Sequence, residues 1–200
     1  MASSRTTQDH VAITLPAPGG RLVVVADTHS APHPGSAVHL AALRPDAILH
    51  AGDIGDLSVL DALATIAPVH AVRGNIDVHA REVPDHLVLD VTCEQGPSLR
   101  IFMVHIGLDG PRLRADVDRK ARAVEASLVV CGHSHIPFVG QQRGLTLFNP
   151  GSIGPRRFQL PILFGTIDLA PTGARLAHFE AATGERFDPK RAAADRAAAK

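Results

Sequence analysis

The sequence contains no tryptophan and no tyrosine, and its 200 residues include only seven phenylalanines. So few aromatic side chains leave little of the stacking platform on which single-stranded nucleic acids bind. The formal net charge is zero, whereas proteins held to nucleic acid by electrostatics carry a basic surplus. The composition therefore argues against a nucleic-acid-binding surface.

Long apolar runs and a disulfide framework are also missing. No apolar stretch approaches the ~20 residues of a membrane span, and the polar N-terminus lacks the apolar segment of a signal peptide. The two cysteines, Cys93 and Cys131, fit buried thiols in a reducing compartment better than a disulfide or a zinc site. We therefore expect a cytoplasmic protein without a membrane segment.

The chain does contain a 45% hydrophobic share, which suffices for the core of one domain. Residues 1–20 are predicted to form an N-terminal extension able to add an edge strand, and residues 21–182 a single domain. Residues 183–200 are rich in alanine and charged residues with little other apolar periodicity, which predicts a flexible or frayed helical tail.

Within the domain, apolar runs of strand length alternate with segments of helical periodicity. Strands are predicted at 22–26, 46–51, 69–73, 86–91, 99–105 and 127–131, and helices at 37–43, 57–67 and 114–126. The last third of the chain reads as short strands joined by turns that contain glycine and proline. This order indicates an α/β fold with helices on the outer faces of its sheets.

Metal-binding side chains stand at or just after the ends of five predicted strands. They are Asp27, His29, Asp53, Asn75, His105, His133 and His135. In open α/β sheets, ligands bind beyond the carboxyl ends of the strands, so these ends would bring the seven side chains together. In extended backbone, residues two apart point the same way, which would pair Asp27 with His29 and His133 with His135.

This set of side chains indicates the kind of ion. Carboxylate, imidazole and amide donors without a thiolate suit Mn, Fe, Zn, Co or Ni better than Ca or Mg. Seven ligands are too many for one tetrahedral site, and they fit two ions about 3.5–4 Å apart that share a carboxylate. We expect two divalent ions per chain, with Mn²⁺ as the first choice and Fe, Zn, Ni, Co or Mg as alternatives.

The same residues form an ordered series of short motifs: Asp27-Thr28-His29, Gly52-Asp53, Gly74-Asn75, His105 and Gly132-His133-Ser134-His135. The series resembles the calcineurin-like metallophosphoesterases. With the run 149–152 (Asn-Pro-Gly-Ser), it is most similar to their small prokaryotic branch, the YfcE-type phosphodiesterases. The resemblance spans about residues 21–170. It implies an αββα sandwich of two facing mixed β-sheets flanked by helices.

The resemblance also implies a role for each ligand. Asp27, His29 and His135 would hold one ion, Asp53 would bridge both ions, and the second would be held by Asn75, His105 and His133. Of these, Asp53, Asn75 and His105 would take part most directly in catalysis.

Residues around the ligands would have supporting roles. His50 and Asp77 would support the ligands without binding metal, and Arg156 would contact the substrate phosphate. Many members of the superfamily carry a histidine directly after Gly-Asn, but this chain has Ile76 there. Because an isoleucine cannot donate a proton, the usual assistance to the leaving group is missing.

We therefore expect a phosphoester hydrolase for a small substrate, in the first place a phosphodiesterase. A hydroxide bridging the two ions would attack phosphorus. Two alternatives stay open: a phosphomonoesterase or nucleotide phosphatase, and a non-catalytic metal-binding interaction scaffold, because a retromer subunit shares the fold. Related small enzymes often self-associate, so the resemblance suggests a homodimer.

Overall fold

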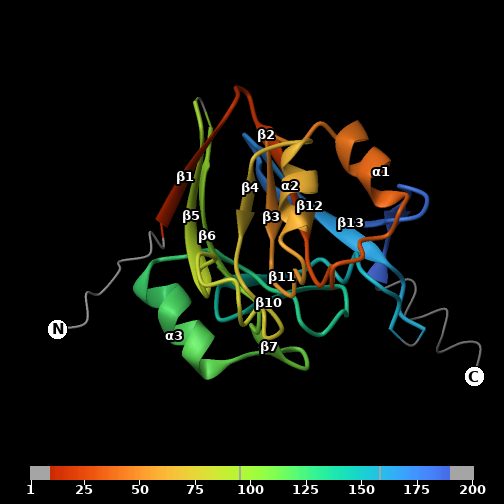
Figure 1. Ribbon diagram of the computed structural model, residues 1–200. Helices are drawn as coiled ribbons and strands as arrows, with labels where there is room; N and C mark the ends of the chain where they lie inside the picture. The colour runs from red at the N-terminus through yellow and green to blue at the C-terminus, as the bar shows by residue number, and fades with distance from the viewer. Residues whose placement is uncertain (1–9, 95, 158, 190–200) are drawn as a thin grey trace, which may run out of the picture.

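The computed structural model describes residues 10–94, 96–157 and 159–189. Two six-stranded mixed sheets dominate it, together with a short hairpin (Figure 1). The first sheet runs in the order β14 (Arg186–Phe187), β13 (Gly173–Glu180), β12 (Leu163–Ala170), β2 (Gly20–Val25), β3 (Ala47–His50) and β4 (Val69–Ala71). The second runs in the order β1 (His10–Leu15), β5 (His86–Cys93), β6 (Ser98–Val104), β9 (Leu128–Val130), β11 (Leu145–Asn149) and β10 (Phe138–Gln142).

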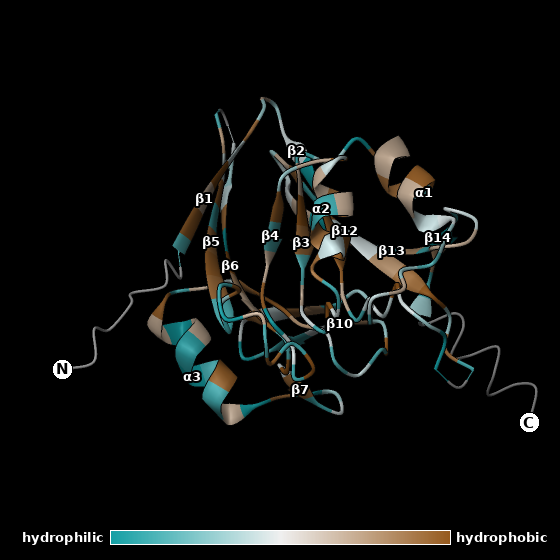
Figure 2. Cartoon of the chain, in the orientation of Figure 1, coloured by the Kyte–Doolittle hydropathy of each residue, from teal (hydrophilic) through white to brown (hydrophobic). Residues whose placement is uncertain are grey.

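The apolar side chains of these elements pack in three layers. Between the sheets, Leu22 and Val24 of β2 share a core with Ile101 and Met103 of β6. On the outer face of the first sheet lie α1 (Ser36–Ala42) and α2 (Ser58–Ala64), and on the outer face of the second lies α3 (Ala115–Ala123). Figure 2 shows the hydrophobic colours on the inner strands β3 and β5, while α3 presents many hydrophilic residues. The predicted αββα sandwich is confirmed.

Strand direction positions the site. In the first sheet β2, β3 and β4 run parallel to one another, and in the second β6, β9 and β11 do so. The central strands β2 and β3 are buried along nearly their whole length because each lies between the other sheet and a layer of helix. Burial on both faces explains why they appear in the sequence as unbroken apolar runs.

One end of the chain agrees with the sequence expectation of an added edge strand, and the other differs from its prediction. Strand β1 lies within the predicted extension and pairs in parallel with β5, where Ile13 and Leu15 enter the core. Residues 186–187, predicted as part of a frayed helical tail, form strand β14 against β13. The open edge of β13 offers unpaired backbone groups, and a two-residue partner is too short to show a sequence period. The rest of that tail, residues 190–200, lies outside the described residues.

Two further short elements follow β6. Strands β7 (Leu108–Asp109) and β8 (Arg112–Leu113) form an antiparallel hairpin that leads into α3. Its strands are also too short to be read from a period. Across the part of the chain that the structure describes, no helix has the length and apolar character needed to cross a membrane.

Candidate metal centre

The seven predicted ligands lie beyond the ends of β2, β3, β4, β6 and β9. Six of them fall into two groups, within each of which the potential ligand atoms lie less than 4.8 Å apart. We name them the Asp27 group (Asp27, His29 and His135) and the Asp53 group (Asp53, His105 and His133). Each group draws on both sheets, because His135, His105 and His133 follow strands of the second sheet. The convergence expected from the sequence is therefore present in the structure.

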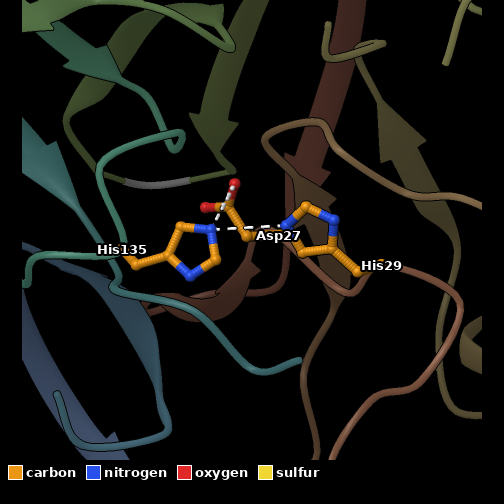
Figure 3. A group of neighbouring side chains, drawn as sticks. All are labelled: Asp27, His29 and His135. Carbon is orange, nitrogen blue, oxygen red and sulfur yellow. Dashed lines mark hydrogen bonds and ion pairs between the residues drawn. The ribbon is translucent and has the colours of Figure 1, made fainter. Parts of the chain in front are cut away.

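In the Asp27 group, two imidazoles and a carboxylate face one another (Figure 3). Nε2 of His135 lies 3.3 Å from Nε2 of His29 and 3.4 Å from Oδ1 of Asp27. The fully buried Asp27 carboxylate also accepts the backbone N–H of His133 at 3.0 Å. Two ring nitrogens at this separation repel each other unless a proton or a cation lies between them. The donor set therefore fits a divalent cation.

In the Asp53 group, hydrogen bonding orients the ring of His105. Its Nδ1 lies 2.8 Å from the carbonyl oxygen of Ala51, so Nδ1 carries the proton and donates it. Its Nε2 lies 3.2 Å from Oδ1 of Asp53 and from Oδ1 of Asn75, where it either donates a second proton or, with an ion bound, would offer its lone pair. A histidine that donates one ring N–H to a carbonyl is the usual form of a metal ligand. Asn75 thus joins the Asp53 group, as expected.

Asp53 lies between the two groups. Its Oδ1 is 3.2 Å from His105, and its Oδ2 is 3.9 Å from Nε2 of His29 in the other group. The backbone N–H of Ile76 also donates to Oδ1, at 3.1 Å. A carboxylate with one oxygen toward each group has the geometry that a bridging ligand needs.

The ligands are held in an uncommon backbone conformation. Five of the seven have positive φ: 56° at Asp27, 46° at His29, 55° at Asp53, 69° at His133 and 58° at His135. Such residues cost about 1–3 kcal/mol each and collect at functional sites. Backbone bonds between the turns hold them, including Asp27 N–H to Gly52 O at 2.9 Å and His29 N–H to Asp53 O at 3.0 Å.

Two glycines allow these turns to approach each other. Gly52 has φ +90°, and a Cβ placed on it would lie 2.6 Å from Nδ1 of His105. A Cβ on Gly74 would overlap the Asp53 carboxylate. Both positions therefore require glycine, because the ligand side chains fill the space where a side chain would stand.

Asp77 ties two ligand loops together. Its carboxylate accepts three backbone N–H groups, from Ile54 at 3.0 Å, Gly55 at 2.8 Å and Gly74 at 2.7 Å. Two of these donors directly follow Asp53 on one loop, and the third directly precedes Asn75 on the other. Asp77 therefore positions ligands without facing the centre.

The ring of His50 forms hydrogen bonds to residues next to the ligands and, among the described residues, to none of the ligands themselves. Its Nδ1 accepts the N–H of Gly52 at 3.2 Å, so Nε2 carries the proton and donates to Oγ1 of Thr28 at 3.0 Å. Thr28 in turn donates to the carbonyl of Ile54 at 2.9 Å. Complete burial lowers the pKa of His50 to about 4, so the ring is neutral. His50 therefore contacts Thr28 of the Asp27 loop and Gly52 of the Asp53 loop, and its supporting role stays a prediction.

The Asn-Pro-Gly-Ser run has a structural role that sequence reasoning missed. Nδ2 of Asn149 donates to the carbonyl of Gly132 at 2.7 Å, next to His133, and Oγ of Ser152 donates to the carbonyl of Asp27 at 3.0 Å. The run thus braces one loop from each sheet. Asparagine, proline, glycine and serine are the residues that favour such turns, which is the signal available in the sequence.

An arginine next to the predicted one contacts a ligand of the centre. Arg156, predicted to bind substrate, is exposed, and among the described residues no hydrogen bond joins it to any of the seven metal-ligand residues. Nη2 of its neighbour Arg157 lies 3.2 Å from Nε2 of His29. Because a guanidinium only donates, that nitrogen of His29 is unprotonated and its lone pair accepts from Arg157; binding an ion through Nε2 would require Arg157 to release it.

The two carboxylates differ in their electrostatics. For the protein groups alone, burial raises the pKa of Asp27 to about 7. Burial also raises the pKa of Asp53, but a second proton on Nε2 of His105 and the N–H of Ile76 donate to the carboxylate, outweigh burial and bring the value to about 2. In spite of the burial of His105, the same contact raises the pKa of that histidine. Burial lowers the pKa of His135 to about 4 and lowers those of His29 and His133. Neutral imidazoles around a desolvated carboxylate favour a bound cation.

The fold and the site define a class of protein: an αββα sandwich with a histidine, aspartate and asparagine cluster at the ends of its strands. Residues 21–171 match the calcineurin-like phosphoesterase superfamily domain, and the chain belongs to this superfamily.

Relatives with curated descriptions agree with this assignment. A probable metallophosphoesterase of Methanocaldococcus jannaschii is 33% identical over 54% of this chain, and the match spans 53% of that protein. One from Methanothermobacter thermautotrophicus is 34% identical over 64% of this chain and 74% of its own length. The phosphodiesterase YfcE of Escherichia coli K12 is 28% identical over 50% of this chain and 52% of its own. The chain thus spans about half the length of the first and third of these relatives.

Solved structures show the same fold at lower identity. Vacuolar Protein Sorting 29 from Cryptosporidium parvum has a TM-score of 0.67 and 18% identity, covering 84% of this chain and 95% of its own. Vps29 from Entamoeba histolytica, complexed with Zn²⁺, has a TM-score of 0.64 and 20% identity, covering 84% and 99%. YfcE from E. coli has a TM-score of 0.56 and 19% identity, covering 84% and 97%.

Proposed function

We propose that this chain hydrolyses small phosphodiesters with the help of two divalent ions held by the seven ligands. The observation that carries the proposal is the position of Asp53, which presents one oxygen to His105 and the other to His29. A carboxylate shared between two ligand groups is the arrangement that a two-ion site requires. The name of the relative YfcE supports a diester as the substrate.

The residues would divide between the ions as the two groups divide. The Asp27 group would hold one ion, and the Asp53 group with Asn75 would hold the other. Nitrogen and oxygen donors favour Mn²⁺, Fe²⁺, Co²⁺, Ni²⁺ or Zn²⁺, and a structural neighbour was solved with Zn²⁺. When bound, two such ions neutralise charge on the phosphoryl oxygens and make hydroxide available near neutral pH.

The protein groups would orient the substrate and restrict proton transfer. Arg157, beside His29, is placed to donate to a non-bridging phosphoryl oxygen. The Nδ1–H bond of His105 to Ala51 prevents its ring from turning during the reaction. Ile76 offers only its backbone N–H, which Asp53 accepts. The leaving group would therefore depart without a proton from this position, which favours esters of acidic alcohols and phenols.

A panel of metals and substrates tests the proposal. The chain is stripped with a chelator and reloaded with Mn, Fe, Co, Ni, Zn or Mg. Hydrolysis of bis(p-nitrophenyl) phosphate and of p-nitrophenyl phosphate is then followed, with metal content measured by mass spectrometry. We expect two ions per chain and faster turnover of the diester. His133→Ala should lose metal binding and diester turnover. His79→Ala, a change at an exposed residue outside the site, should keep both properties. Faster turnover of the monoester would support a phosphomonoesterase instead.

An interaction scaffold is the second candidate, and one observation favours it. Large apolar side chains are exposed directly after two of the ligands: Ile76 is 41% exposed and Ile136 is 52% exposed. Such side chains can contact a protein partner, and structural neighbours include a protein sorting component. Two bound ions without turnover of any ester, under any of the metals, would support the scaffold and refute the hydrolase.

A further inference from the structure

We propose that a cavity beside the Asp53 group binds the organic arm of the substrate, and that this arm carries a second phosphate held by Arg73 and Arg114. The proposal rests on the proposed hydrolysis of phosphodiesters and specifies the substrate class of that same site. It assigns a role to two arginines that lie outside the ligand set.

The cavity adjoins the centre directly. Its volume is about 300 Å³, and both Asn75 and His105 line it. Volumes of this order suit a small ligand such as a sugar phosphate. An ester whose reacting phosphorus lay at the two ions would therefore have this space within reach of one of its organic groups.

Two arginines line the same cavity from different parts of the fold. Arg73 lies just after β4 of the first sheet, and its backbone N–H donates to Pro84 O at 2.9 Å. Arg114 lies between β8 and α3, and its backbone N–H donates to Gly107 O at 3.0 Å.

The acidic partner of Arg73, Asp85, lines the same cavity and holds the guanidinium in place. Nε and Nη2 of Arg73 donate to the two oxygens of Asp85 at 2.5 and 3.1 Å. The side chain of Asp85 is 70% exposed and that of Arg73 only 32%, so the carboxylate is the outer member of the pair. The second edge of the guanidinium, with Nη1, makes no bond to Asp85 and is free to donate to a ligand.

Arg114 has a similar but looser arrangement. Its Nε donates to Oδ1 of Asp116 at 3.3 Å, and both side chains are about half exposed. Asp85 and Asp116 line the cavity together with the arginines that they pair with, and each arginine keeps guanidinium donors for another anion. Arginine binds phosphate through paired N–H groups, and two arginines on one small cavity suit a group with several acceptor oxygens. A neutral organic arm would leave these donors unused.

Matched substrates test the proposal. One is the p-nitrophenyl ester of thymidine monophosphate, and the other is the same ester with a second phosphate on the sugar. Both release nitrophenolate, so a difference in rate reports on the sugar phosphate. We expect kcat/KM to be about tenfold higher for the bisphosphate, mainly through KM. In Arg73→Gln and Arg114→Gln, the ratio of kcat/KM for the bisphosphate ester to that for the monophosphate ester should fall toward one. Arg119→Gln, an exposed α3 arginine that does not line the cavity, should keep it.

A binding measurement separates this inference from the proposed activity. Calorimetry compares thymidine bisphosphate with thymidine monophosphate on the metal-loaded chain. If both esters are cleaved equally fast and both nucleotides bind equally, the inference is overturned while the hydrolase stands. If neither ester is cleaved but the bisphosphate binds more tightly and loses this advantage in Arg73→Gln, the hydrolase fails and the anion cavity stands. Equal binding without cleavage overturns both.

Discussion

Asp27 and Asp53 both follow buried strands of the first sheet and both face histidines, yet their acidities differ widely. The pKa of Asp27 is raised to about 7, whereas that of Asp53 is lowered to about 2. Burial dominates at Asp27, which accepts one backbone N–H. Asp53 has both His105 and the N–H of Ile76 as partners. Contacts within the protein therefore keep Asp53 ionised without a cation, whereas Asp27 needs a nearby cation to stay ionised at neutral pH.

The largest effect expected from this comparison is on activity. Asp53→Asn removes the carboxylate that faces both groups, and we expect kcat/KM for bis(p-nitrophenyl) phosphate to fall by about a thousandfold or more. Metal analysis should show less than one ion per chain. Asp61→Asn, at an exposed position on α2, is the control. Retention of two ions and of activity in Asp53→Asn would show that Asp53 does not bridge.

The next effect is on the stability of the chelator-treated chain. The pKa of Asp27 in the fold lies above its unfolded value, so its contribution to stability is full below about pH 4 and lost as pH rises through about 7. Asp27→Asn should therefore stabilise this form at pH 8 by about 2–4 kcal/mol, and the gain should vanish near pH 4. Asp53→Asn should destabilise it at pH 8, because a lowered pKa means that the ionised form is favoured.

Urea unfolding at the two pH values, in the presence of chelator, measures both variants. If Asp27→Asn and Asp53→Asn shift the free energy of unfolding at pH 8 in the same direction, the contrast between the two carboxylates does not exist.

A smaller effect is expected at the arginine beside the Asp27 group. Arg157→Gln should raise KM for bis(p-nitrophenyl) phosphate by about tenfold, because it removes a charged donor to the phosphoryl oxygens. Arg156→Gln is the matched control one residue away and should change KM by less than about twofold. Steady-state kinetics with saturating metal measure both, and a reversed order would restore Arg156 as the substrate contact.

The smallest effect concerns the residue beside the Asp53 group. Ile76→His should speed the hydrolysis of alkyl esters by about tenfold, through proton donation to the leaving oxygen, with little change for nitrophenyl esters. The slope of log kcat against leaving-group pKa measures this. An unchanged slope in Ile76→His would show that position 76 does not reach the leaving group. A flat slope in the natural chain would remove the reason to expect any proton donor there.

Much of this site could be predicted because its residues stand where apolar strands end. The runs that became β2, β3, β6 and β9 are buried on both faces and are readable as continuous apolar segments. A ligand such as Asp27 or His133 then breaks each run, and parallel strands bring such breaks to one end of a sheet.

The rest depends on contacts between segments far apart in the sequence. The positive φ of Asp53 is imposed by the fold around it, and aspartate alone does not predict it. The proton position on His105 follows from the carbonyl of Ala51, 54 residues away. Strand β14 exists because β13 has an open edge. The choice of Arg157 over Arg156 depends on where the loop turns after Ser152.

Both ligand groups take members from both sheets, and this has a consequence for folding. Neither sheet alone can offer a complete set of donors, so ions cannot template one sheet before the other has formed. If this chain holds two ions as proposed, they would bind only after the sheets have docked and would then hold the docked state. Each tenfold rise in free ion above its dissociation constant would add about 1.4 kcal/mol to the stability of the whole sandwich. The ions would thus stabilise the contact between the two sheets as well as take part in the reaction.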